Sequence, residues 1–243
     1  MAAYERFASF YDVVMDDPGP RAARVDDCVR RYRPDAGSLL ELGCGTGSIL
    51  ARLDTTAELT GLDRSPEMLA IAARKVPGAR LVEGDMADFD LGRRFDVVAC
   101  VFDSINHLLD VAQWSALFEC VHRHLEEGGL FVFDVNSVGE LRRLGGEPPW
   151  VYDFEGGTAI IDVTFAESDD GSAITDWDIR IFEQVDATHY ELHHERIGEL
   201  ALPLARVRAL SGHRFELLEE VDEDGLVATD DSIKAYYALR RTS

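Results

Sequence analysis

A glycine-rich segment and a later acid are the residues whose spacing most clearly indicates chemistry. Gly43, Gly45 and Gly47 follow a short apolar run, and Asp63 ends a second apolar run about 20 residues after the first glycine. Glycine adopts backbone angles that other residues avoid and lets a ligand approach the main chain. A carboxylate at the position of Asp63 can accept hydrogen bonds from ribose hydroxyls. The spacing therefore predicts a site for a nucleoside-containing cofactor.

The position of the third glycine distinguishes two kinds of cofactor. A dinucleotide-binding loop has glycine or alanine where this chain has Ser48, and the third glycine here is Gly47. Residues 41–47 instead resemble the first motif of the class I S-adenosylmethionine-dependent methyltransferases. An NAD-dependent oxidoreductase stays open as an alternative that Ser48 opposes. The resemblance implies that the cofactor contacts Glu41, Gly43, Cys44, Gly45 and Gly47.

Later segments resemble further motifs of the same family: residues 61–68, 83–86, 95–104 and 125–131. The second motif implies that Asp63 binds the ribose and that Met68 packs on the adenine. The third implies that Asp85 reaches the adenine amino group and that the main chain of Met86 contacts the ring. The family pattern adds Arg64 and Phe102 to the expected cofactor site.

Two departures place the chain in a branch of this family. Enzymes that methylate adenine, cytosine or a glutamine amide usually carry Asn/Asp-Pro-Pro-Tyr where this chain has Phe-Asp-Ser-Ile-Asn-His at residues 102–107. Residues 10–12 and a strand-rich insertion are similar to small-molecule methyltransferases, including the N-methyltransferases of deoxyamino sugars. The resemblance implies S-adenosylmethionine as cofactor and methyl transfer to an N or O atom of a small-molecule acceptor. A non-catalytic regulatory protein that binds S-adenosylmethionine is a further alternative.

Methyl transfer from a sulfonium is a direct displacement, so the protein must align the reacting atoms and exclude water. An alcohol or a protonated amine also needs a base. The candidates are His107 and Asp103, which follow the fourth apolar run, where ligands of open parallel sheets bind. Tyr11 resembles the N-terminal tyrosine that closes over the cofactor in related enzymes. Alternation along a strand would turn either His193 or His194 toward the same pocket.

The sequence indicates no metal site. Asp134 and Asn136 lie two residues apart and could join Asp103 around a magnesium ion, as in catechol-type methyltransferases. That pattern uses adjacent Asp and Asn residues, whereas Val135 intervenes here. The four cysteines lack paired spacing, which predicts neither zinc nor disulfides and fits a reducing cytoplasm.

Short apolar runs alternate with amphipathic stretches, which predicts a Rossmann-like α/β fold with a mostly parallel seven-stranded sheet and flanking helices. The predicted parallel strands are residues 39–42, 58–62, 80–82, 95–101 and 130–135, and the last two strands are 214–221 and 232–239. A helix is expected directly after the glycine segment, another after Ser65-Pro66-Glu67, and a third along the stripe from Trp114 to Leu125, closed by Gly128-Gly129. The same helix would carry His122 and His124 at the surface. Residues 150–155, 158–166, 173–185 and 189–200 predict an inserted antiparallel β-meander, and residues 203–210 a last helix.

These elements predict one domain over residues 1–243. Within it we expect an N-terminal helical lid at 1–38, a cofactor-binding core at 39–147, a β insertion over the active site at 148–200, and the C-terminal helix and strands at 201–243.

The amino-acid composition limits the kinds of molecule that the protein is expected to bind. With 46% hydrophobic residues, the 243-residue chain can bury one sizeable core. A formal net charge of -22 opposes nucleic-acid binding and could attract an amine. The sequence lacks an N-terminal basic segment followed by an apolar run, and also lacks a membrane-length apolar run, so we expect a cytoplasmic protein without membrane contact. No pattern indicates an oligomeric state.

Overall fold

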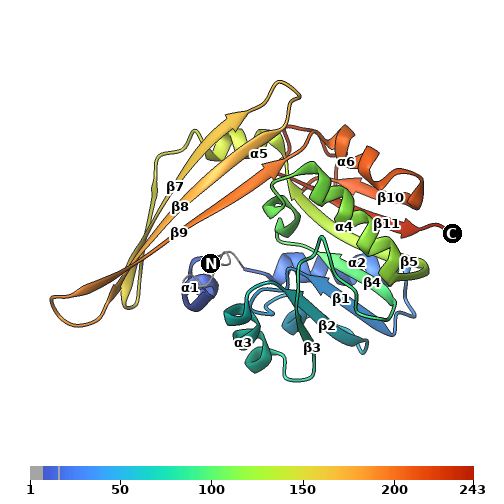
Figure 1. Cartoon of the computed structure of the whole chain (residues 1–243), viewed down its shortest axis with the longest axis horizontal. Helices are drawn as coiled ribbons and strands as arrows, with labels where there is room; N and C mark the ends of the chain where they lie inside the picture. The colour runs from blue at the N-terminus through green and yellow to red at the C-terminus, as the bar shows by residue number, and fades with distance from the viewer. Residues whose placement is uncertain (1–7, 16) are drawn as a thin grey trace.

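The computed structural model describes residues 8–15 and 17–243 and contains two sheets with flanking helices (Figure 1). The helices are α1 (Ala8–Val14), α2 (Gly19–Tyr32), α3 (Pro66–Lys75), α4 (Val111–His124), α5 (Val138–Leu144) and α6 (Leu204–Ser211), with 3-10 helices η1 (Leu50–Arg52), η2 (Ser104–His107) and η3 (Gly212–Arg214). The strands are β1 (Ser38–Leu42), β2 (Glu58–Asp63), β3 (Arg80–Glu83), β4 (Phe95–Cys100), β5 (Leu125–Asn136), β6 (Trp150–Phe154), β7 (Gly157–Glu167), β8 (Ala173–Gln184), β9 (Tyr190–Ala201), β10 (Phe215–Val221) and β11 (Lys234–Arg241). Part of the predicted N-terminal lid, residues 1–7 and 16, lies outside the described residues.

The larger sheet has the order β10-β11-β5-β4-β1-β2-β3, in which β11 runs antiparallel to both of its neighbours. Its central strands are apolar along nearly their whole length because helices cover both faces. Helices α4 and α6 pack on one face, and α2 and α3 pack on the other. The predicted Rossmann-like α/β sheet is therefore confirmed.

The direction of strand order reverses between β1 and β4, which lie side by side in the larger sheet. In open α/β sheets, ligands bind outside the carboxyl ends of the strands at such a reversal. Gly43 follows β1 and Phe102 follows β4, so both motif segments meet at this edge.

The predicted β-meander is also confirmed, as the antiparallel sheet β6-β7-β8-β9. Figure 1 shows it projecting from the larger sheet as a long arm, with α1 beneath it. Ile161, Ile179 and Ile197 on its inner face pack with Phe10 and Tyr11 of α1. None of the helices among the described residues is long and apolar enough to cross a membrane.

The helix expected directly after the glycine segment was a wrong prediction. The structure has turns there, followed by the three-residue 3-10 helix η1. Gly43, Gly45 and Gly47 all adopt positive φ values of 51° to 75°, so a right-handed helix cannot begin before residue 48, and β2 already begins at Glu58. The helix expected after Ser65 is confirmed, and the Ser65 hydroxyl accepts a hydrogen bond from Met68 N at 3.2 Å.

Two details around α4 were also wrong. The helix ends at His124, and Leu125 already pairs with Phe95 as the start of β5, so Gly128-Gly129 lies within an irregular part of that strand. His124 is buried, with 4% of its surface exposed. Its Nε2 accepts a hydrogen bond from Leu91 N at 3.1 Å, which gives the ring a structural role that helical periodicity alone does not reveal.

Candidate active site

The glycine loop and Asp63 are joined directly. One carboxylate oxygen of Asp63 accepts a hydrogen bond from Gly45 N at 2.8 Å, and the other accepts one from Ser65 N at 2.9 Å. A Cβ atom added to Gly43 would lie 2.9 Å from the Ser104 Cβ, so this glycine lets the loop approach the segment after β4. Asp63 therefore holds the loop in place at the same edge of the sheet where its carboxylate borders a cavity.

Two adjoining cavities follow this edge. The first, of about 250 Å³, is lined by Asp63, Arg64, Met68, Asp85, Met86, Phe102, His107 and Tyr11, among others. The second, of about 280 Å³, is lined by Glu41, Gly43, Cys44, Gly45, Thr46 and again Tyr11 and Phe102. Gly47 lines neither cavity, and a Cβ there would contact Ala72 and Val76 instead. The expected cofactor residues therefore come together, except that Gly47 packs against α3 and the residue that follows it.

Glu41 has an unusual environment at the end of β1. It is buried, and its Oε2 atom has no hydrogen-bond partner among the described residues. Burial and the nearby Asp63 raise the pKa of the Glu41 carboxyl well above its ordinary range. A buried acceptor of this kind, beside a cavity, is suited to an N–H donor from a ligand.

A third cavity, of about 350 Å³, lies beneath the four-stranded sheet. Apolar side chains of that sheet, including Ile161, Trp177, Ile179 and Ile197, form one wall. The sheet also contributes Glu199 to the lining. The other charged or titratable lining residues include Arg21, Asp103, His107, Glu140, Arg143 and Lys234. Tyr11 and Phe102 border this cavity and both of the others, so they mark the place where all three meet.

The turn after β4 has a strained backbone. Phe102 and Asp103 adopt φ values of 66° and 52°, a left-handed conformation that residues other than glycine rarely take. The Arg21 guanidinium lies 3.9 Å from the centre of the Phe102 ring, and Asp103 N donates to Asp134 Oδ1 at 3.1 Å. Such strain concentrates at functional sites, where surrounding contacts hold it in place.

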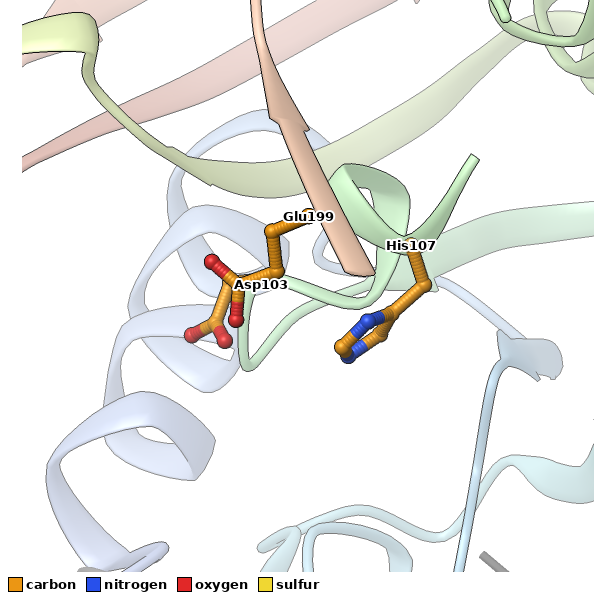
Figure 2. Close-up of side chains that lie close together, drawn as sticks. All are labelled: Asp103, His107 and Glu199. Carbon is orange, nitrogen blue, oxygen red and sulfur yellow. The ribbon is translucent and has the colours of Figure 1, made fainter. Parts of the chain in front are cut away.

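Asp103, His107 and Glu199 form a compact polar cluster (Figure 2). One ligand atom of each lies within 4.8 Å of the others, although the residues come from the turn after β4, from η2 and from β9. Asn106 connects these elements, because its amide nitrogen donates to Asn136 O and to Leu200 O. The sequence indicated His107 and Asp103 but not Glu199, which the insertion contributes.

The protonation state of His107 follows from its surroundings. Its Nδ1 lies 3.2 Å from Gly198 O, and since a carbonyl oxygen can only accept, Nδ1 carries the proton and Nε2 is the basic nitrogen. Burial lowers the pKa of His107 below its ordinary value of 6.5, and this effect exceeds the opposing attraction of Asp103. The imidazole is therefore neutral near pH 7 and can accept a proton.

Lys234 is a second residue that sequence reasoning missed. Its ammonium donates to the Asp103 carboxylate and, at 2.6 Å, to Asn136 Oδ1, and it lies 3.9 Å from Asp134 Oδ2. Burial opposes ionisation of Asp103, but the Lys234 ammonium outweighs it and holds the pKa of that carboxyl below its ordinary range. The position considered for magnesium is thus occupied by an internal cation.

The pKa of Glu199 is raised to about 8 by burial and by the negative charge of Asp103, despite a hydrogen bond from Asn136 Nδ2 at 3.0 Å. Glu199→Gln is therefore expected to flatten the pH dependence of stability. The native carboxyl keeps its proton to about pH 8, whereas the unfolded one releases it near pH 4.5, so the native state binds more protons between these values. The free energy of unfolding of the wild type consequently falls as the pH rises through this window.

Thermal unfolding measured between about pH 5 and pH 8 tests this expectation. Glutamine cannot titrate, so the Glu199→Gln variant should lose less of its Tm over the window than the wild type. Glu191→Gln, at the exposed end of the same strand, is the matched control and should keep the wild-type slope. Equal slopes for Glu199→Gln and wild type would contradict the assigned pKa.

The histidines of the insertion lie outside the three cavities. The His193 ring packs against Phe10, with 5.3 Å between ring centroids, and its Nε2 lies 2.8 Å from Glu183. His194 points to the other face of the strand and pairs with Asp178 at 3.0 Å. The alternation of the strand therefore turns His193 toward α1 rather than into a cavity.

Helix α1 is attached to the glycine loop as well as to the insertion. Asp12 accepts hydrogen bonds from Thr46 Oγ1 at 2.7 Å and Ser48 Oγ at 2.9 Å, and it pairs with Lys75 at 2.7 Å. These contacts hold the neighbouring Tyr11 where the cavities meet. Burial and the charges of Asp103 and Asp63 raise the pKa of Tyr11, so its hydroxyl stays protonated.

Comparisons with known proteins agree with this geometry. A family model described as a methyltransferase domain matches residues 39–129. The cypemycin N-terminal methyltransferase of Streptomyces sp is 30% identical over 222 residues, which cover 90% of this chain and 87% of that protein. The chain belongs to the class I S-adenosylmethionine-dependent methyltransferases.

Further relatives of this chain are named for amino sugars. The dTDP-3-amino-3,6-dideoxy-alpha-D-glucopyranose N,N-dimethyltransferase of Streptomyces fradiae is 43% identical over 132 residues, 52% of each chain. The match thus spans about half the length of that relative. The structure of CalS10 with bound S-adenosylmethionine, an amino pentose methyltransferase from Micromonospora echinaspora, is 26% identical, covers 100% of this chain and 99% of that one, and has a TM-score of 0.76.

The cavities fit the chemistry of S-adenosylmethionine. Asp63 presents a carboxylate suited to ribose hydroxyls, and Met68 and Met86 line the same cavity with apolar surface. The unpartnered oxygen of Glu41 borders the second cavity and suits an ammonium group. The residues present therefore match the two ends of an S-adenosylmethionine molecule.

Proposed function

We propose that this protein transfers a methyl group from S-adenosylmethionine to an amine nitrogen of a small-molecule acceptor. The cluster of Asp103, His107 and Glu199 carries the proposal, because it lies beside the meeting point of the three cavities. Three groups that can accept hydrogen bonds suit the N–H groups of an amine better than a single hydroxyl. Two relatives, one named for an amino sugar and one named as an N-terminal methyltransferase, support an amine.

When bound, S-adenosylmethionine supplies a methyl group activated by an adjacent sulfonium. Asp63 would hold its ribose, Met68 and Met86 its adenine, and Glu41 its amino group. Tyr11 and Phe102 would then enclose the reacting centre, since they border the cofactor cavities and the acceptor cavity. Their rings exclude water from that point.

The polar cluster prepares the acceptor. The carboxylate of Asp103 attracts an ammonium into the cavity, and the net charge of -22 favours its approach. His107 Nε2 accepts a proton from that ammonium, which exposes the nitrogen lone pair. Asp103 then stabilises the positive charge that the nitrogen regains during transfer. Ile161, Ile179 and Trp177 hold the apolar part of the acceptor against the sheet.

We also propose that this reaction takes place in the cytoplasm. The four cysteines are buried and free, as expected in a reducing compartment.

An acceptor assay tests the proposed activity. The protein is incubated with S-adenosylmethionine and pairs of acceptors that differ only in an amino or a hydroxyl group, such as a 3-amino-3-deoxy sugar nucleotide and its 3-hydroxy counterpart, with a peptide N-terminus as a second amine. Mass spectrometry should show methylation of the amine and equimolar S-adenosylhomocysteine. Methylation of the hydroxyl compound alone would instead establish an O-methyltransferase. Tight cofactor binding without turnover on any acceptor would favour the regulatory alternative.

A further inference from the structure

One buried ammonium connects three elements around the proposed nitrogen site. Lys234 belongs to β11, the antiparallel strand of the larger sheet, and its side chain is 10% exposed. It donates to Asp103 in the turn after β4 and, at 2.6 Å, to Asn136 at the end of β5. The contacts of the Lys234 ammonium described here are all made with side chains of the chain itself.

Lys234 also determines how Glu199 is held. An ammonium can only donate, so it must face the carbonyl oxygen of the Asn136 amide. The amide nitrogen is thereby turned toward Glu199, to which it donates at 3.0 Å. Without the ammonium, the Asn136 amide is free to turn over and present its oxygen to the Glu199 carboxyl.

The strained turn depends on the same charge. Phe102 and Asp103 keep their left-handed conformation beside Asp134, whose carboxyl accepts from Asp103 N at 3.1 Å. Two carboxyl groups in one buried place repel one another unless a cation lies between them. Lys234 is that cation, 3.9 Å from Asp134 and hydrogen-bonded to Asp103.

We propose that Lys234 is a positioning residue for methyl transfer, which holds Asp103 directly and Glu199 through Asn136 around the acceptor nitrogen. The inference rests on the proposed function, since it takes the nitrogen to bind at this cluster. Lys234 acts through these carboxyl groups, whereas His107 is the proton acceptor.

The test compares Lys234→Met with Arg240→Met. Arg240 lies on the same strand as Lys234, and its substitution removes a surface charge that pairs with Glu216 of β10. Lys234→Met is expected to lower kcat about 100-fold, because misplacing a reactive group by about 1 Å costs that much. Binding of S-adenosylhomocysteine, measured by calorimetry, should change less than about threefold. Arg240→Met should leave both quantities unchanged.

The pH profile separates positioning from general stabilisation. Groups that face Asp103 are Lys234 on β11, His107 on η2, Arg21 on α2, Asp134 on β5, Glu199 on β9 and Tyr11 on α1. Lys234 lowers the pKa of the Asp103 carboxyl and also that of His107. Its loss raises both pKa values, so the acid side of the kcat profile, which His107 governs in the wild type, moves to higher pH. A residue that only stabilised the fold would lower Tm without moving this limb.

Further outcomes decide the remaining cases. If Lys234→Met does not fold, Lys234→Gln keeps a hydrogen-bond donor without the charge and should show the same shift. An unchanged kcat and acid limb, or an equal loss of cofactor binding and turnover, would overturn the inference. If the wild type methylates no amine, the proposed function fails separately. A crystal structure of Lys234→Met with S-adenosylhomocysteine then tests the positioning itself, and an unaltered Phe102-Asp103 turn and Asn136 amide would reject it.

Discussion

Replacing Asp63 with alanine is expected to weaken the binding of S-adenosylmethionine at least about 100-fold. The carboxylate is placed for the ribose hydroxyls and also accepts hydrogen bonds from Gly45 N at 2.8 Å and Ser65 N at 2.9 Å. Hydrogen bonds to a charged group contribute about 1.5–3 kcal/mol each, so two lost contacts are sufficient for this effect. Alanine removes the ligand contact and loosens the loop at once.

Calorimetric titration with S-adenosylmethionine, S-adenosylhomocysteine and NAD measures this effect. Glu58→Ala, at the exposed start of the same strand, removes an acid that pairs with Arg93 and should bind the cofactor normally. Normal binding by Asp63→Ala would show that the glycine segment and this acid do not form the cofactor site. Binding of NAD alone to the wild type would favour the oxidoreductase alternative.

Replacing His107 with alanine is expected to lower kcat by about 100-fold to 1,000-fold, within the range that positioned proton acceptors contribute. The Nδ1 proton is directed to Gly198 O, so Nε2 is the nitrogen that can accept a proton. Affinity for S-adenosylhomocysteine should change less than about threefold, since no predicted polar contact to the cofactor involves this ring. Steady-state kinetics with a saturating amine, together with calorimetry, separates the two effects.

Two variants make this result specific. His107→Gln can still donate to Gly198 O but accepts a proton poorly, so it should be as slow as alanine. In the wild type, kcat should fall on the acid side below pH 6.5, because burial lowers the pKa of His107 from that value and protonation removes the base. The kcat of the glutamine variant should no longer fall on the acid side.

His189→Ala, on the exposed loop before β9, is the control and should keep wild-type activity. Full activity of His107→Ala would exclude the proposed role.

Local sequence patterns were sufficient for the cofactor half of the site. Gly43 and Gly45 lie on the loop that directly follows β1, and Asp63 is the last residue of the neighbouring parallel strand β2, so the strand order alone brings them together. The cap at Ser65 and the four strands of the insertion are likewise set by residues close in sequence. Only the first expected helix failed there, because the left-handed Gly43, Gly45 and Gly47 delay any helix until residue 48 and β2 already begins at Glu58.

The acceptor half depends on contacts between distant segments. Glu199 follows His107 by more than 90 residues, and Lys234 is farther still, so neither has a local pattern that marks it as functional. Their positions follow from register, since Lys234 pairs with Asn136 across β11 and β5. A buried lysine at the first residue of β11 was the available signal, and it becomes meaningful only once its facing carboxylates are known.

The sequence contains two lysines, and both Lys75 and Lys234 belong to the networks described above. Amine-directed reagents therefore have few side-chain targets outside the reaction centre. The partly exposed Lys75 lies beside the glycine loop, where a bulky adduct would displace α1. Dye labelling, surface immobilisation or cross-linking through lysine would thus report on an altered protein. Handles for such experiments should be engineered as cysteines on the exposed arm, since the natural cysteines are buried.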